Sequence, residues 1–530
     1  MQLLIAPHLN YDPNITRRTS DKCWQNLWRT NNSKNSAYVV AFNIVFYLFV
    51  TYGSTKSKSG GKTKDKKILL IKKKYVVLST HSERQIYLWG CMSNNKLTRG
   101  QREAVALLSI GMFLEYFDLM LYIHMAVFLN EIFFPQADKT TAQLVTAATF
   151  CSTYLMRPVG GFIIGWIGDR MGRKTVIMIT TTIMAISCIV MASVGTYAEI
   201  GVTASVVMIL CRMSQGLSSV GEAIGSEIYI SETFKSPYKY IYCGIIDISG
   251  MMGGIFSLLV ASFALSVGLN WRLAFWIGAS IAIFSFVARV RLGESKEFIE
   301  HQNKLKAQAG LDKQKVEDKS VHPEKIDKNA IFAYFLIRII AVACIYIVFA
   351  YMGEYMKEKL GYTSEEVIHQ NTIISILVII GTVVALSFAK KYHPTKIAKA
   401  TVFFFLVFLP FIPWWLSNIT GAISLTCVQF VMFSFGLYLI GMEVVCFKYF
   451  PITKRFTILA TTFGVASVLG QIVIAFGLIP LTEHLGYYGL WVIYIPVIGG
   501  FLYGINYIEK LEKKRGVYDI YPNEKSININ

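Results

Sequence analysis

The sequence predicts an all-α polytopic membrane protein with twelve transmembrane helices in two six-helix bundles. Three observations support this fold class. Of the 530 residues, 54% are hydrophobic and only 16% are charged, which gives a mean hydropathy of +0.47. Apolar runs of about 20 residues, the length that crosses the hydrocarbon core of a bilayer, recur along the chain. The loops between these runs alternate between basic and poorly charged.

The apolar runs form two sets of six, separated by a charged stretch at residues 291–328 that we expect to hold a surface helix and a linker. The first set is predicted at 104–130, 141–166, 175–197, 202–229, 241–267 and 271–290, and the second at 330–353, 367–389, 397–417, 421–446, 457–480 and 488–508. The expected organisation is an N-terminal bundle at 92–290, a central loop at 291–328, a C-terminal bundle at 329–510 and a tail at 511–530.

The distribution of basic residues predicts the orientation of these spans. Every second loop is basic. The basic residues of these loops, loop by loop, are Lys96, Arg99 and Arg102; Arg170, Arg173 and Lys174; Lys235 and Lys239; Lys390, Lys391 and Lys396; Lys448, Lys454 and Arg455; and Lys510, Lys513, Lys514 and Arg515. The intervening loop 131–140 has one lysine and loop 418–420 has none. Because lysine and arginine are retained in cytoplasmic loops, both ends of the core and the central loop are expected in the cytoplasm. The same pattern accounts for the net charge of +19 without a nucleic-acid partner.

Residues 1–91 do not fit the twelve-span pattern. Their one apolar run, about 37–52, is short and has positive charge on both sides, and as a thirteenth span it would place Met1 outside. The tripeptide from Gly61 to Thr63 resembles the end of a phosphate-binding loop, but that motif needs glycine where this chain has Lys56. We therefore expect the working protein to begin at Met92, with 1–91 either untranslated upstream sequence or a poorly ordered extension.

Several functional classes lack their signatures in this sequence. The histidines are scattered and there is no HExxH, GxSxG or CxxC motif, so we predict no enzyme activity, catalytic residue, metal site or cofactor. A channel would need a repeated pore-lining filter, and none is visible. An ATP-driven pump would need a nucleotide-binding loop, and none is visible either.

Ionisable residues inside the spans are the main functional candidates, because a charge in the bilayer is costly and is usually retained for a reason. Glu115 and Asp118 lie three residues apart, hence on one face of the first span, and Tyr122 continues that face. In the fourth span, Ser218 and Glu222 belong to a polar stripe that repeats every four residues. The other charged span residues are Arg157, Arg212, Glu227, Asp247, Arg338 and Glu443.

These residues suggest transport coupled to protons. Burial raises the pKa of a carboxyl group and a nearby arginine lowers it, so a carboxylate that meets an arginine in one conformation only would bind and release a proton. The proton-coupling candidates are Glu115, Asp118, Glu222 and Asp247, and we expect the first three to lie against Arg157. The alternative is that these groups are fixed ion pairs that hold helices together.

The sequence leaves two classes of solute open. A carboxylate would bind Arg157 or Arg338, and Tyr116, Tyr122 and Ser218 are further substrate-binding candidates. A quaternary ammonium would need an aromatic cage, for which the available side chains are Tyr116, Phe117, Tyr122, Tyr346, Tyr351, Trp414 and Trp415. A zwitterion such as proline could use both.

The segment from Gly160 to Lys174, GGFIIGWIGDRMGRK, resembles the loop signature of the major facilitator superfamily and lies where that superfamily has it, between spans two and three. Its glycines allow a tight turn, and its charges can form a network at helix ends. The resemblance implies a major facilitator fold with a conformational latch on the cytoplasmic side. The latch candidates are Gly168, Asp169, Arg170, Gly172, Arg173 and Lys174.

Residues 95–510 are also similar to the metabolite:proton symporter group of that superfamily, in particular its proline/betaine branch. The matching segments are Leu114–Asp118, Arg157–Gly161, Arg212–Ser218 leading to Gly221 and Glu222, then Glu232, Asp247 and Asn270–Arg272. The resemblance implies a monomer of a bacterial inner membrane that takes up a small polar solute, either a proline/betaine-type osmolyte or a small carboxylate, together with protons by alternating access. A proton-independent facilitator or exchanger is the alternative within the same fold, and a polytopic membrane enzyme is the alternative of another class.

Overall fold

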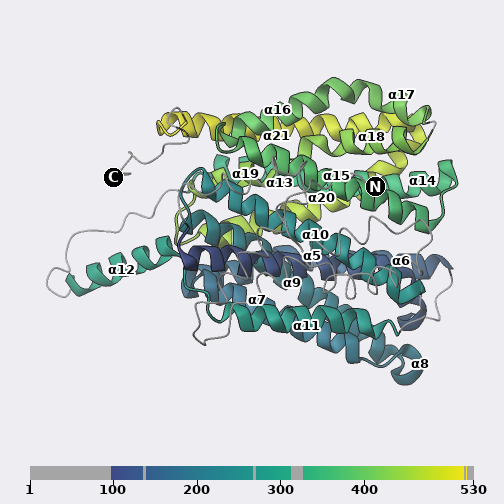
Figure 1. The fold of residues 1–530 in the computed structure, drawn as a ribbon, viewed down its shortest axis with the longest axis horizontal. Coiled ribbons are helices and arrows are strands. Elements are labelled where there is room, and N and C mark those ends of the chain that lie inside the picture. Colours follow the sequence, from purple (N-terminus) through teal and green to yellow (C-terminus); the bar gives the residue numbers. More distant parts are fainter. Residues whose placement is uncertain are drawn as a thin grey trace, which may run out of the picture. The chain divides into compact units, whose positions relative to one another are not determined.

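The computed structural model describes residues 97–134, 139–266, 270–311, 326–419, 421–437, 439–518 and Tyr521. The chain divides into two units, Met1–Gly90 and Cys91–Asn530, and all described residues belong to the second. The expectations about residues 1–91 and about a start at Met92 therefore lie outside the described residues. The described part is built of helices, so the predicted all-α fold class is confirmed (Figure 1).

The first half of the described chain contains six long helices. They are α5 (Arg99–Phe133), α6 (Lys139–Met171), α7 (Arg173–Ser193), α9 (Val202–Thr233), α10 (Tyr238–Ser266) and α11 (Arg272–Arg289), with the short α8 (Tyr197–Ile200) between α7 and α9. Within this first half, α10 packs on α5, and both α9 and α11 pack on α7. The described part of the central stretch contains one further helix, α12 (Lys296–Leu311).

The second half also contains six helical stretches, but three of them are interrupted. The three interrupted stretches are α13 (Lys328–Ile345) with the π-helix η2 (Tyr346–Tyr351) and α14 (Met352–Leu360), α16 (Pro394–Phe408) with η3 (Leu409–Phe411) and α17 (Ile412–Ser417), and α18 (Ala422–Phe433) with η4 (Ser434–Gly436) and α19 (Leu439–Phe447). The other three are α15 (Ser364–Phe388), α20 (Arg455–Leu485) and, after η5 (Gly486–Tyr488), α21 (Gly489–Lys514). The three interruptions are short π or 3₁₀ turns, which commonly mark bends in helices.

Ten helical stretches in the described part of the chain are long and apolar enough to cross a membrane. The two long helices that are not among the ten are α6 and α9, with 33 and 32 residues. At 1.5 Å per residue each is about 50 Å long, which exceeds the thickness of a bilayer. The hydropathy of α9 is lowered by Arg212, Glu222, Glu227 and Glu232. The protein is therefore a multi-pass membrane protein.

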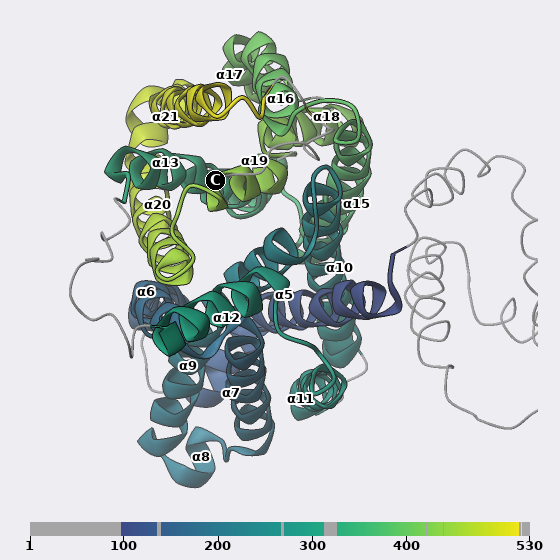
Figure 2. The ribbon, with the colours of Figure 1, turned by 90° about the vertical axis from the view of Figure 1, so that its left-hand side faces the viewer.

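The two halves meet mainly along α6 and α20, and also where α10 lies against α15 and α19 and where α9 lies against α20 (Figure 2). Glycine makes the first contact possible. A Cβ atom on Gly161 would lie 2.4 Å from the carbonyl oxygen of Ala460, and one on Gly464 would lie 2.5 Å from that of Arg157. Small residues let membrane helices approach at backbone distance. The helix that carries the sequence signature, α6, is thus the helix that contacts the second half most closely.

Candidate functional site

The end of α6 is tied directly to the start of α20. The carboxylate of Asp169 accepts hydrogen bonds from the backbone N–H groups of Phe456 and Thr457, both at 2.9 Å, and from the Thr457 hydroxyl at 2.7 Å. The first N–H groups of a helix have no partner within the helix, so a carboxylate is a favourable acceptor there. A residue of the first half therefore caps a helix of the second.

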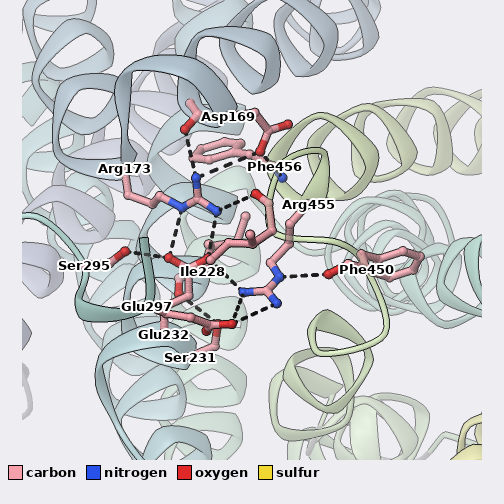
Figure 3. A network of polar contacts seen from close by, with 12 residues as sticks. Asp169, Arg173, Ile228, Ser231, Glu232, Ser295, Glu297, Phe450, Arg455 and Phe456 are labelled. Carbon is pink, nitrogen blue, oxygen red and sulfur yellow. Dashed lines mark hydrogen bonds and ion pairs between the residues drawn. The ribbon is translucent and has the colours of Figure 1, made fainter. Parts of the chain in front are cut away.

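Glu232, at the end of α9, is the centre of a buried network between the halves (Figure 3). Its carboxylate accepts from Arg173 Nε at 2.9 Å and Nη2 at 2.8 Å, from Arg455 Nη1 at 2.9 Å, and from the Ser295 hydroxyl at 2.6 Å. Arg455, at the start of α20, also contacts Glu297 of α12 at 3.1 Å. We call Asp169, Arg173, Glu232, Glu297 and Arg455 the latch network.

The turn between α6 and α7 supports this network. Gly172 has φ +100°, in the region that favours glycine, and a Cβ atom there would lie 2.1 Å from Glu294 Oε2. The Glu294 carboxylate accepts the backbone N–H of Arg173 at 3.0 Å and that of Lys174. Burial raises the pKa of Glu294, and the hydrogen bonds from the backbone oppose that rise. The turn is held by the residues just before α12.

The latch candidates taken from the sequence lie together, but the charge network differs from the expected one. Arg170 makes no ion pair with another described residue, and its guanidinium stacks over Trp166 at 4.1 Å from the ring centroid. Lys174 donates to the carbonyl of Val290 at 3.0 Å. Arg173 lies 4.0 Å from Asp169, at the limit of an ion pair, and pairs more closely with Glu232, at 2.8 Å. The sequence analysis missed Glu232, Glu294, Glu297 and Arg455 as partners.

Two of the proton-coupling candidates are held by arginines of their own half. Asp118 lies 3.5 Å from Arg212 and accepts from the Cys188 thiol at 3.3 Å. Glu222 accepts from Arg289 Nη1 at 2.7 Å, and Thr181 donates to the same carboxylate. In this conformation Asp118 and Glu222 contact Arg212 and Arg289 in place of Arg157, and the expected contact with Arg157 in one conformation of the cycle stays a prediction. For Glu222, the sequence analysis overlooked Arg289, because it lies at the predicted end of a span.

Glu115 and Arg157 remain without ion pairs in the described part of the chain. The Glu115 side chain is buried, and its Oε2 atom has no hydrogen-bond partner. The charged groups with electrostatic influence on it are Arg157, Asp118, Glu222 and Arg212. The Arg157 guanidinium lies over Tyr154 at 4.4 Å and over Phe463, on α20, at 5.7 Å. An uncompensated carboxyl and an uncompensated guanidinium thus occupy the same region near the boundary between the halves.

Arg338 is not free to bind a solute in this conformation. Its Nη2 lies 2.5 Å from Glu227 of α9 and its Nη1 lies 2.6 Å from Glu443 of α19. Its Nε donates to the Tyr334 hydroxyl at 2.8 Å. Asp247, on α10, is influenced electrostatically by Glu227 and Arg338. We call Glu227, Arg338 and Glu443 the bridge, because it joins the two halves inside the bundle.

The uncharged substrate-binding candidates do not share one site, because each contacts a different set of neighbours. Tyr122 is buried beneath the guanidinium of Arg212, at 4.1 Å, and the Ser218 hydroxyl donates to the carbonyl of Gln215 in its own helix. Tyr116 packs against Gly250. Of the proposed cage residues, Phe117 packs against Phe113 and Phe256, whereas Trp414 is 65% exposed. The seven aromatic side chains do not form one cage.

Among the described residues, no three histidine, cysteine, aspartate or glutamate side chains lie so that they could hold a metal ion. The polar groups that converge are the carboxylates and guanidinium groups described above. Their chemistry is that of ion pairing.

The Major Facilitator Superfamily model matches residues 108–478, which is more than half of the chain. The chain belongs to this superfamily. Solved superfamily members share its fold. The proton:xylose symporter XylE bound to 6-bromo-6-deoxy-D-glucose aligns with a TM-score of 0.59 and 15% identity over 78% of this chain and 95% of that one. The human organic anion transporter MFSD10 aligns with a TM-score of 0.54 and 14% identity.

Curated relatives within the superfamily are bacterial transporters. The proline/betaine transporter of Escherichia coli K12 is 26% identical over 424 residues, covering 75% of this chain and 82% of the relative. The proline/betaine transporter of Salmonella typhimurium is 29% identical over 53% of this chain, which spans 57% of that relative's length. The alpha-ketoglutarate permease of E. coli K12 is 32% identical over 38% of this chain and 48% of its own length.

Proposed function

We propose that this superfamily member carries a small polar solute together with protons across a bacterial inner membrane by alternating access. The observation that carries the proposal is Glu115, a buried carboxyl whose Oε2 atom has no partner. An ionised carboxylate is costly in such a place, and a protonated carboxyl costs much less. Glu115 is therefore suited to take up a proton in one conformation and to release it in another.

Arg157 is the proposed solute contact. It is a guanidinium without an ion pair among the described residues, and rings from both halves flank it. A planar guanidinium fork binds a carboxylate with two parallel hydrogen bonds. The named relatives include carriers of proline and betaine, of alpha-ketoglutarate and of citrate, each of which bears a carboxylate. We therefore favour a carboxylate-bearing solute, either a zwitterion or a small organic acid.

The orientation in this proposal follows the basic loops, so that the latch network lies on the cytoplasmic side. Asp169 and Glu232 then hold the halves together at that side, as expected for a state whose cytoplasmic side is closed. A facilitator or exchanger without protons would show the same latch. Such a carrier would not need an unpartnered buried carboxyl, and for this reason symport is favoured.

Uptake into proteoliposomes tests the proposal. Radiolabelled proline, betaine and 2-oxoglutarate are supplied with and without an imposed proton gradient, and Arg157→Ala serves as the variant that lacks the solute contact. Gradient-stimulated uptake of one solute by the wild type, lost in the variant, is the expected result. Uptake that ignores the gradient would replace symport with facilitated transport or exchange.

A further inference from the structure

Phe463, on α20 of the second half, contacts two guanidinium groups that come from different halves. Its ring centroid lies 5.7 Å from the guanidinium carbon of Arg157 on α6 and 4.8 Å from that of Arg338 on α13. Both distances fall within the range of about 6 Å over which an aromatic ring attracts a cation. The other described rings over these groups, Tyr154 and Tyr334, contact one guanidinium each. Phe463 therefore links the proposed solute contact to the second half.

The two guanidinium groups differ in how firmly they are held. Arg338 is fixed by the two carboxylates of the bridge, at 2.5 and 2.6 Å. Arg157 makes no ion pair with a described residue, and its buried Nε atom has no hydrogen-bond partner. Its guanidinium is therefore oriented by ring contacts, one from Tyr154 of its own helix at 4.4 Å and one from Phe463.

Glycine contacts fix the position of Phe463 beside Arg157. Gly464, the next residue on α20, approaches α6 so closely that a Cβ atom on it would lie 2.5 Å from the Arg157 carbonyl oxygen. Gly160 approaches α9 in the same way, and a Cβ atom there would lie 2.4 Å from the Leu217 carbonyl oxygen. The part of α6 that carries Arg157 is thus held at backbone distance against both α9 and α20. The Phe463 ring stays beside Arg157 as long as α20 keeps this contact with α6.

These contacts prepare the Arg157 side chain to bind a solute. A cation–π contact leaves the hydrogen-bond donors of a guanidinium unused, so the planar fork remains able to bind a carboxylate. The rings restrict the rotation of the side chain before the solute arrives. Binding to a side chain that already has its bound orientation loses less conformational entropy and is therefore tighter.

We propose that Phe463 is a positioning residue for the solute, because its ring holds the Arg157 guanidinium in the orientation that receives the solute carboxylate. The proposal rests on the solute contact of the proposed function and extends it. The high-affinity form of the site needs both halves, since Arg157 supplies the hydrogen bonds and Phe463 supplies the orientation. The solute should therefore bind more tightly in conformations in which α20 contacts α6 beside Arg157.

The test measures KM and kcat for exchange of labelled for unlabelled solute in proteoliposomes without a proton gradient. The solute is whichever of proline, betaine and 2-oxoglutarate the wild type carries. Phe463→Leu is expected to raise KM by about fivefold, which corresponds to the loss of one cation–π contact, while kcat changes by less than about twofold. Phe463→Tyr keeps a ring and should restore the wild-type KM. Phe408→Leu removes another half-buried ring, which packs on Phe404, and should leave KM unchanged.

Combination with Arg157→Ala shows whether Phe463 acts through Arg157. Arg157→Ala is expected to raise KM, and in this background Phe463→Leu should raise it no further, because the side chain that the ring orients is absent. A ring with a merely structural role would affect KM equally in both backgrounds. Thermal unfolding in detergent checks that each variant folds, and Phe463→Met takes the place of Phe463→Leu if the leucine variant does not.

Two results would overturn the proposal. One is a wild-type KM in Phe463→Leu when Arg157→Ala raises KM. The other is an equal rise of KM on Phe463→Leu in both backgrounds. A wild-type KM in Arg157→Ala would instead refute the solute contact of the proposed function. Failure of symport in the gradient assay would leave this test intact, since exchange needs no gradient.

Discussion

Arg455 and Glu232 face each other across the boundary between the two halves, 2.9 Å apart, although 223 residues separate them in the chain. The same carboxylate also receives both N–H groups of the Arg173 fork. One buried anion thus stabilises a cation of each half. Without it, the two cations would repel each other and would keep only Asp169, 4.0 Å from Arg173, and Glu297, 3.1 Å from Arg455.

Glu232→Gln should therefore release the latch. The glutamine keeps the shape of the side chain but leaves Arg173 with Asp169 at 4.0 Å and Arg455 with the half-exposed Glu297, and removal of one partner from a buried ion pair costs about 3–5 kcal/mol. We expect a larger population with the halves apart at that end, measured as longer distances between spin labels at positions 235 and 391. Glu199→Gln, at an exposed pair with Arg272, is the control. Unchanged distances would show that the latch does not depend on this anion.

Glu115→Gln should abolish uptake driven by a proton gradient while it preserves exchange of labelled for unlabelled solute. Glutamine mimics the protonated carboxyl, so the carrier can still change conformation with solute bound but cannot release a proton. Glu103→Gln lies on the same helix at an exposed pair with Arg99 and should behave like the wild type. Gradient-driven uptake by Glu115→Gln would remove Glu115 from proton coupling.

Arg157→Lys should raise KM for a carboxylate-bearing solute by about tenfold or more, because lysine keeps the charge but loses the planar fork. The value of kcat should change less. Arg99→Lys, at an exposed position, is the matched control. If KM in Arg157→Lys equals that of the wild type, the solute carboxylate is bound elsewhere.

Glu222→Gln should lower stability more than it changes coupling, because Arg289 and Glu222 form a pair within one half. The single variant leaves the buried Arg289 charge unpaired, at a cost of about 3–5 kcal/mol. The double variant Glu222→Gln with Arg289→Met should recover much of this loss in thermal unfolding in detergent. A double variant that is less stable than both singles would contradict a purely pairwise role.

Gly161→Ala should disfavour the joined state of the two halves. The added Cβ would lie 2.4 Å from the Ala460 carbonyl oxygen, and such overpacking costs about 1–3 kcal/mol. Gly499→Ala adds a methyl group to open space and should have no effect. Transport rates together with label distances would show whether Gly161→Ala lowers turnover through this contact.

The sequence was sufficient for the fold class and for the identity of the charged residues, but not for their pairing. Hydropathy and loop charge reflect how each span interacts with the bilayer. Because the bilayer acts on each span separately, the spans could be predicted one by one. Pairing depends on which helix faces come together. Arg289 reaches Glu222 because α11 and α9 both pack on α7, and Arg455 reaches Glu232 because α20 lies against α6 and α9. No spacing within the chain encodes these contacts.

The interrupted helices make the two halves mechanically unequal. In the second half, the backbone hydrogen-bond pattern changes at Tyr346–Tyr351, Leu409–Phe411 and Ser434–Gly436, and each change is a point of low bending stiffness. The long helices of the first half have no such turn in the part of the chain that the structure describes. The long helices of the first half can bend at Pro158, inside α6, whereas the second half can also flex at these three turns and should absorb more strain locally.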